Sequence, residues 1–183
     1  MVSTYSYNAC NKVTKLVTKS GKFDISSYEY SYYLDGSDAC KVRNENGIIE
    51  TTSYDYDGLK RLTKESISNG KTADTYSYEY DDYGNRSKMV ANGSEEYETV
   101  YDYTVNGKYT ALLQKEIKTV KETPSAVTSN NGLAISPTDL ITSTAADAKR
   151  EETAYSYDAN GNQITKITAD KTETNTYDSL NQL

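Results

Sequence analysis

A repeated tyrosine pattern constrains the fold of this chain more than any other feature. The segments YSYNACNKVTK, YDYDGLKRLTK and YDYTVNGKYTA begin at Tyr5, Tyr54 and Tyr101, at offsets of 49 and 47 residues. A second segment type alternates with the first, because YEYSYYLDGSD begins at Tyr28 and YSYEYDDYGNR begins 48 residues later at Tyr76. Self-similarity at a period of roughly 20 to 50 residues indicates an array of stacked structural units.

Within each segment, tyrosines alternate with small polar or acidic residues, as in YSYEY over residues 76–80. A period of two is typical of a β-strand that packs one face. By this pattern 16 of the 19 tyrosines share one parity of their strand. The three exceptions are Tyr33, Tyr83 and Tyr109.

Turn signals follow the tyrosine runs and predict β-hairpins. These signals are Asp57-Gly58, Gly84-Asn85, Gly161-Asn162, Asn69-Gly70, Asn92-Gly93 and Asn106-Gly107. Seven half-repeats of two strands each predict up to 14 strands, and a twisted sheet of that size tends to curl or split. The predicted fold class is therefore all-β, with consecutive antiparallel β-hairpins forming a curved or spiralling sheet, a partial shell or barrel.

One insertion interrupts this array between residues 120 and 150. The segment contains no tyrosine and holds both prolines of the chain, Pro124 and Pro137. Ser136, Pro137 and Asp139 together form a helix-start pattern, which predicts a short helix reaching about Arg150. The domain prediction is a single β domain over residues 1–183 that carries this insertion. Because the last unit stops mid-repeat, a fragment of a longer array with an unpaired sheet edge is also expected.

Composition assigns an unusual role to tyrosine. Leu, Ile, Val and Phe make up 29 of 183 residues, about 16%, below the roughly 20% at which disorder becomes a serious interpretation. Tyrosine supplies 19 of the 20 aromatic residues. We therefore expect tyrosine to supply much of the core, and aromatic residues suit a pleated sheet.

Charge and residue types also argue against several functions. The formal net charge is −7 and the pI is near 4.7, which disfavours binding to nucleic acid or to an anionic membrane. The sequence contains no run of 18 apolar residues, so no membrane-spanning helix is predicted. The opening MVSTYSYNAC lacks the features of a signal peptide. Histidine, the commonest general base and zinc ligand, is absent from the sequence.

Three units resemble the tyrosine–aspartate (YD) repeats of the rearrangement-hotspot (RHS) family. They are YDYDGLKRLTKE, YSYEYDDYGNRSK and YSYDANGNQITK, starting at Tyr54, Tyr76 and Tyr155. The resemblance covers nearly the whole chain except the insertion. It implies a long β-sheet that spirals into a hollow shell, which encloses a toxic domain in bacterial toxins and serves cell adhesion in the similar teneurin shell. The Asp-Pro-containing motif that ends such a shell is not found here.

The resemblance implies a non-enzymatic structural segment of a larger surface or secreted protein, located outside the cell or on its surface. The expected partners are flanking domains of the parent chain, with edge-to-edge self-association as a further option. The alternative is a carbohydrate-binding module that uses exposed tyrosines, for which the off-parity Tyr33, Tyr83 and Tyr109 are the candidate contacts. No cofactor, metal ligand or catalytic residue is predicted.

Other patterns favour structural interpretations. DANGNQI from Asp158 imitates the start of a calcium loop, but Gln163 and Ala169 stand where glycine and a bidentate glutamate belong. Acid pairs such as Asp55/Asp57 suggest glycosidase chemistry only if they face each other across a cleft. The two cysteines, Cys10 and Cys40, do not align in the repeat frame and are expected to be free thiols.

Overall fold

The structure, a computed structural model, describes residues 1–121, 149–178, 180 and 182. The described residues form β-strands and turns with no helix, which confirms the all-β prediction. Contacts divide the chain into two compact units, Met1–Glu95 and Glu96–Leu183. The prediction of one domain over residues 1–183 stays a prediction.

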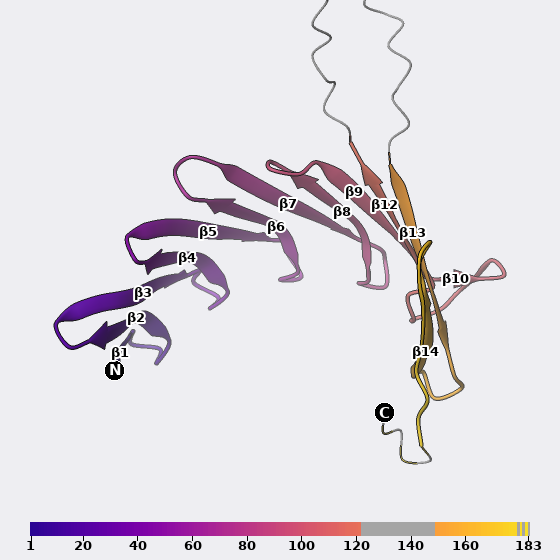
Figure 1. Cartoon of the computed structure of the whole chain (residues 1–183), viewed down its shortest axis with the longest axis horizontal. Helices are drawn as coiled ribbons and strands as arrows, with labels where there is room; N and C mark the ends of the chain where they lie inside the picture. Colours follow the sequence, from indigo (N-terminus) through magenta and orange to yellow (C-terminus); the bar gives the residue numbers. More distant parts are fainter. Residues whose placement is uncertain (122–148, 179, 181, 183) are drawn as a thin grey trace, which may run out of the picture. The chain divides into compact units, whose positions relative to one another are not determined.

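The first unit contains eight strands that follow one another in chain order, each hydrogen-bonded to the next and antiparallel to it (Figure 1). They are β1 (Val2–Tyr7), β2 (Val13–Ser20), β3 (Phe23–Tyr32), β4 (Asp38–Glu45), β5 (Ile48–Tyr56), β6 (Leu62–Ser68), β7 (Ala73–Tyr80) and β8 (Arg86–Asn92). The predicted meander of hairpins is therefore confirmed in this unit.

The second unit has the sheet order β9-β12-β13-β14-β15, again antiparallel throughout. A small separate ribbon, β10-β11, connects β9 to β12. The strands are β9 (Tyr97–Asp102), β10 (Thr104–Val105), β11 (Lys108–Tyr109), β12 (Lys115–Val120), β13 (Arg150–Tyr157), β14 (Gln163–Ile167) and β15 (Thr172–Thr174).

Strand register places the tyrosines of the first unit on one face of its sheet. Directly paired residues share a face, and Tyr54 pairs with Glu65, which in turn pairs with Tyr76. The opposite face carries small polar side chains together with some charged and aliphatic ones, such as the paired Glu29 and Val42. One continuous row of paired residues across that face reads Ser31, Cys40, Ser53, Ser66, Thr75 and Asn92.

The sheets have no second layer over them among the described residues. Ala91, 2% exposed, is the only fully buried apolar residue there, and Thr52 and Thr99 are the buried polar ones. The expectation that tyrosine forms much of a buried core is therefore wrong. The strand tyrosines are mostly half-buried, because they lie over a single sheet and nothing packs on them from above.

The predicted insertion falls largely on residues 122–148, outside the described part of the chain. At its flanks, β12 and β13 pair directly, with Thr119 opposite Arg150. The backbone N–H of Val120 also donates to the carbonyl of Lys149 (2.9 Å). Arg150 begins β13. The prediction that a helix reaches about Arg150 is therefore wrong at that residue. The rest of that helix lies in the residues that are not described.

Candidate functional site

One loop type recurs along the chain, and Asp57 shows how it forms. The N–H of Asp57 donates to the carbonyl of Arg61, and the N–H of Lys60 donates back to the carbonyl of Asp57. The Asp57 carboxylate accepts the N–H groups of Leu59 and Arg61 (both 2.9 Å) and the Arg61 guanidinium Nε–H (2.7 Å). One aspartate thereby satisfies the backbone donors that the tight loop leaves without strand partners.

We call this arrangement the Asx loop, defined by an N–H bond from its first residue to the carbonyl of its fifth. In four further loops an Asp or Asn stands first and its side chain accepts the N–H of the third and fifth residues. The first residues of these loops are Asn8, Asp81, Asp158 and Asp178. In the loop at residues 33–37 the first residue is Tyr33, and Asp35 accepts the N–H of Ser37 instead (2.9 Å).

The fourth residue of each Asx loop has a left-handed backbone where the structure gives its φ. Gly84 has φ of 87°, whereas Lys60 has φ of 62° without being glycine. A residue in this conformation after a turn closes a three-residue hairpin connection and is accompanied by a bulge. The register indeed shifts one residue before the loop in five hairpins, at Tyr7, Tyr32, Tyr56, Tyr80 and Tyr157.

In two of these loops, at Asp57 and Asp158, the hydrogen bonds favour the charged form of the carboxylate. The backbone N–H of Arg61 is the largest cause that lowers the pKa of Asp57, and the Arg61 guanidinium adds to it. Hydrogen bonds from the Asn162 side chain and backbone lower the pKa of Asp158 in the same way. Donors directed at a carboxylate favour its ionised form.

Before four of the Asx loops, the preceding tyrosine connects its hairpin to the strand before it. The Tyr32 hydroxyl donates to the carbonyl of Val13 (2.6 Å), the first residue of β2. The Tyr80 hydroxyl donates to the carbonyl of Leu62 (2.7 Å), the first residue of β6. In the second unit, Tyr157 and Tyr177 make the corresponding bonds to the carbonyls of Leu113 and Gln163. The Tyr-Asp pairs at Tyr80, Tyr157 and Tyr177 therefore both link one hairpin to its neighbour and close the loop that follows.

A basic side chain adds to this link in alternate hairpins. Lys12, the fifth residue of its loop, has its ammonium 4.8 Å from the ring centre of Tyr32 and also donates to the carbonyl of Gly36. The Arg61 guanidinium lies 4.5 Å from the ring centre of Tyr80. A cation over an aromatic face is attractive at this distance. The two alternating segment types therefore differ in their contacts, because the hairpins that contain Lys12 and Arg61 place a cation over a tyrosine ring of the next hairpin.

Tyr33, the first of the three predicted contacts, lies at a hollow on the loop side of the first unit. Its side chain is partly exposed, and its hydroxyl donates to the carbonyl of Tyr54 (2.9 Å). Its ring meets that of Tyr56 edge to face, with ring centres 6.2 Å apart. The hollow measures about 470 Å³, and its lining consists of Tyr33, Leu34, Asp35, Ser37, Asp55, Tyr56 and Asp57.

Tyr83 lies in a different loop of the first unit, and Tyr109 lies on a strand of the second unit. Tyr83 is the third residue of the Asx loop that begins at Asp81, and it is 73% exposed. Tyr109 lies on β11 in the second unit, with its ring centre 6.1 Å from that of Tyr103. All three are exposed, and Tyr33 alone lines the 470 Å³ hollow.

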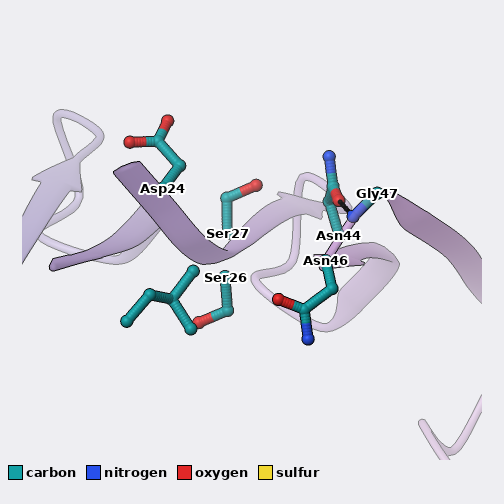
Figure 2. Close-up of a pocket in the computed structure, with 7 residues that line it drawn as sticks. Asp24, Ser26, Ser27, Asn44, Asn46 and Gly47 are labelled. Atoms are coloured by element: carbon teal, nitrogen blue, oxygen red, sulfur yellow. Dashed lines mark hydrogen bonds between the residues drawn. The ribbon is translucent and has the colours of Figure 1, made fainter. Parts of the chain in front are cut away.

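A smaller polar hollow of about 170 Å³ lies at the other end of the hairpins (Figure 2). Its polar groups serve the turn between β4 and β5. The Asn44 side-chain oxygen accepts the N–H of Gly47 (3.2 Å), and the N–H of Asn46 donates to the carbonyl of Ile25 (3.3 Å). Asn46 and Gly47 both have positive φ, as an Asn-Gly hairpin turn requires. We assign this hollow to turn formation.

The remaining candidates also have structural surroundings. Both carboxylate oxygens of Asp158 accept hydrogen bonds from its own loop, the second from the Asn162 side chain (2.9 Å). In the described part of the chain, no three Cys, Asp or Glu residues are grouped to hold a metal ion. Cys10 is exposed, Cys40 is half-buried, and both are free thiols.

Sequence reasoning missed the Asx role of the aspartates and the exposure of the first tyrosine pair. Tyr5 and Tyr7 on β1 are 54% and 56% exposed, and their rings are stacked with centres 6.5 Å apart. Both have the parity that predicts packing. The available signal was their position in the first hairpin of the array, since the later hairpins each follow another one.

No protein-family model matches the chain, and no curated protein has a matching sequence. Among the described residues, no helix has the length and apolar character needed to cross a membrane.

Proposed function

We propose that this chain is a non-enzymatic structural segment of a larger RHS/YD-repeat protein, outside the cell or on its surface, where it builds part of a β-shell that encloses or presents another domain. The observation that carries the proposal is the recurrent Tyr-Asp unit. Its tyrosine hydroxyl bonds to the preceding hairpin, as from Tyr80 to Leu62 (2.7 Å), and its aspartate closes the loop that follows.

A single sheet without a second layer favours the same role. Folded domains are normally built from two or more packed layers, and here the described residues provide one. Repeat arrays are stabilised mainly by contacts between neighbouring units. Such an array can be extended by further hairpins, so it suits the wall of a larger structure.

The test is an immunoblot of fractionated source cells with an antibody raised against this chain. We expect a band several times larger than 20.4 kDa in the surface or secreted fraction, because a wall segment needs the rest of its shell. A band near 20.4 kDa that is confined to the cytosolic fraction would contradict the proposal.

Carbohydrate binding at the Tyr33 hollow is a second candidate, favoured by the chemistry of that hollow. Tyrosine rings present an apolar face together with a hydroxyl, and the carboxylates of Asp35 and Asp55 line the same space. The hollow volume of about 470 Å³ falls in the range of small-ligand sites, roughly 300–1,000 Å³.

Affinity electrophoresis in gels that contain cell-wall polysaccharides tests this candidate. If the hollow binds sugar, the parent chain is retarded and Tyr33→Ala loses the retardation while its circular dichroism stays unchanged. Leu59→Ala is the matched control, because Leu59 is an exposed loop residue outside the hollow. Equal mobility of the parent and Tyr33→Ala in every gel would contradict carbohydrate binding there.

A further inference from the structure

We propose that the hollow at Tyr33 binds a sugar that carries a free, positively charged amino group, the chemical class of a hexosamine without an acetyl group. This inference rests on the second candidate function, carbohydrate binding at the same hollow, and names its substrate class. The site combines a wall of two tyrosine rings with the carboxylates of Asp35 and Asp55.

The first step is that the hollow lies at a loop that departs from the repeated design. The other described Asx loops begin with Asp or Asn, whose side chain closes the loop, whereas this loop begins with Tyr33. The Tyr33 side chain is directed instead to the next hairpin, where its hydroxyl donates to the carbonyl of Tyr54 (2.9 Å) and its ring meets that of Tyr56. Departures from a regular structural pattern are expected at functional sites.

The second step concerns the apolar wall of the hollow. The rings of Tyr33 and Tyr56 stand nearly perpendicular to each other, at 89°, and both line the hollow. One ring can therefore lie against the apolar face of a sugar while the other borders its edge. The hydroxyl bond of Tyr33 fixes its ring before a ligand arrives, which lowers the ordering cost of binding.

The third step concerns the sign of the charge in the hollow. Its lining contains three carboxylates and, among the described residues, no Lys or Arg. The Asp57 carboxylate is bonded to its own loop and to Arg61, so Asp35 and Asp55 supply the charge that a ligand meets. The backbone N–H of Ser37 is the largest cause that lowers the pKa of Asp35, which favours the charged carboxylate. A protonated amine forms strong, charge-assisted hydrogen bonds with such a pair, and an acetylated amine does not.

A lysine of the chain already shows this chemistry at the border of the hollow. The Lys60 ammonium lies 3.3 Å from the Asp35 carboxylate, and the two side chains are 62% and 39% exposed. An exposed ion pair contributes little stability, so a ligand amine can displace Lys60 from Asp35. Removal of the Lys60 charge should therefore strengthen binding of a cationic ligand, which a purely structural role of this pair does not predict.

A basic peptide fits the hollow less well than an amino sugar. A lysine side chain is long and flexible, so its rotamer freedom is lost on binding. Its narrow methylene chain also covers little of a tyrosine ring. A sugar ring is rigid and broad, and it places an amine and several hydroxyls at fixed positions around one apolar face.

The test compares two disaccharides that differ at their amino groups. Isothermal titration calorimetry measures binding of the full chain to a disaccharide of glucosamine and to its doubly N-acetylated form, at a pH at which the free amines are protonated. We expect the charged disaccharide to bind roughly tenfold more tightly. A dilysine peptide with blocked ends supplies the same two charges without sugar rings and should bind more weakly than the charged disaccharide.

Two substitutions identify the carboxylates as the contact. Asp55→Asn should raise the Kd of the charged disaccharide roughly fivefold, and Lys60→Gln should lower it roughly twofold. Asp82→Asn is the matched control, because Asp82 is an exposed acid in another Asx loop and does not line the hollow. We expect its Kd to match that of the parent. Circular dichroism checks that each variant is folded.

Several results would overturn the proposed class of ligand. They are equal Kd values for the two disaccharides, equal effects of Asp55→Asn and Asp82→Asn, and binding of dilysine as tight as that of the charged disaccharide. Tight binding of the acetylated form would still leave carbohydrate binding in place, whereas absence of binding by either sugar would remove this inference. None of these results changes the size of the band in the immunoblot, so the structural role is tested separately.

Discussion

At the scale of single residues, the aspartate that begins an Asx loop is a turn-forming group. Asp57 accepts two backbone N–H groups and one guanidinium N–H, and Asn8 accepts the two equivalent N–H groups without a charge. The amide therefore suffices for the loop geometry. The carboxylate adds an interaction with Arg61, and that interaction depends on pH.

Replacing Asp57 with Asn should flatten the pH dependence of stability. The folded-state pKa of Asp57 is lowered, first by the N–H of Arg61. Its ionised form therefore stabilises the fold above the unfolded-state pKa, and this stabilisation is lost as pH falls through the folded-state pKa. The urea midpoint of Asp57→Asn should be below that of the parent at pH 7, and the two should converge in acid, below about pH 4.

Urea titrations from pH 7 to pH 2.5 with both proteins give this comparison. Asp82→Asn serves as the control, because Asp82 is the exposed second residue of an equivalent loop. Parallel curves for the parent and Asp57→Asn would show that the Asp57 charge has no part in the acid response.

At the scale of elements, the hairpin is the building unit and the tyrosine before its loop is the link between units. The link combines a hydroxyl bond to a backbone carbonyl with, in alternate hairpins, a cation over the ring. Tyr56 makes a different contact, since its ring packs edge to face against Tyr33. Tyr56 can make this contact because Tyr33 is the first residue of its loop, where the other Asx loops have Asp or Asn.

Replacing Tyr80 with Phe should cost about 1 kcal/mol of unfolding free energy, the usual net contribution of one hydrogen bond. The change removes the hydroxyl that donates to Leu62 and keeps the ring beside Arg61. Urea denaturation followed by circular dichroism measures the loss. Tyr7→Phe is the matched control and should cost much less, because Tyr7 has the same place on an open edge and is exposed. Equal losses would mean that the hydroxyl bond adds nothing to the link.

At the scale of the whole molecule, each unit is a sheet stabilised by contacts between neighbouring hairpins. Hardly any apolar side chain is fully buried in the described residues, so the usual hydrophobic core contributes little. Strand pairing, half-buried tyrosines and loop hydrogen bonds take its place. An architecture of this kind gains stability as hairpins are added, because each added hairpin provides contacts for the tyrosines of the hairpin beside it.

Much of this fold follows from local pattern. The alternation around Tyr76 and Tyr78 predicts a strand and its face, and Asn46-Gly47 is an explicit turn signal. The same pattern assigns Tyr5 and Tyr7 to packing, which is wrong because packing depends on a neighbouring hairpin. The hollow at Tyr33 could not be predicted from the sequence either, because it forms where one loop faces residues from the next hairpin.

The sequence by itself determined the elements: the period of two, the turn residues and the repeat length specify strands, hairpins and their order, because these depend on neighbours a few residues apart. Only the tertiary structure decided what those residues do for one another. The bond from Tyr80 to Leu62 spans 18 residues, and the hydroxyl bond from Tyr33 to Tyr54 spans 21. Such contacts require the stacking of successive hairpins, which brings distant backbone carbonyls within reach of a tyrosine hydroxyl and leaves Tyr7 exposed at the edge.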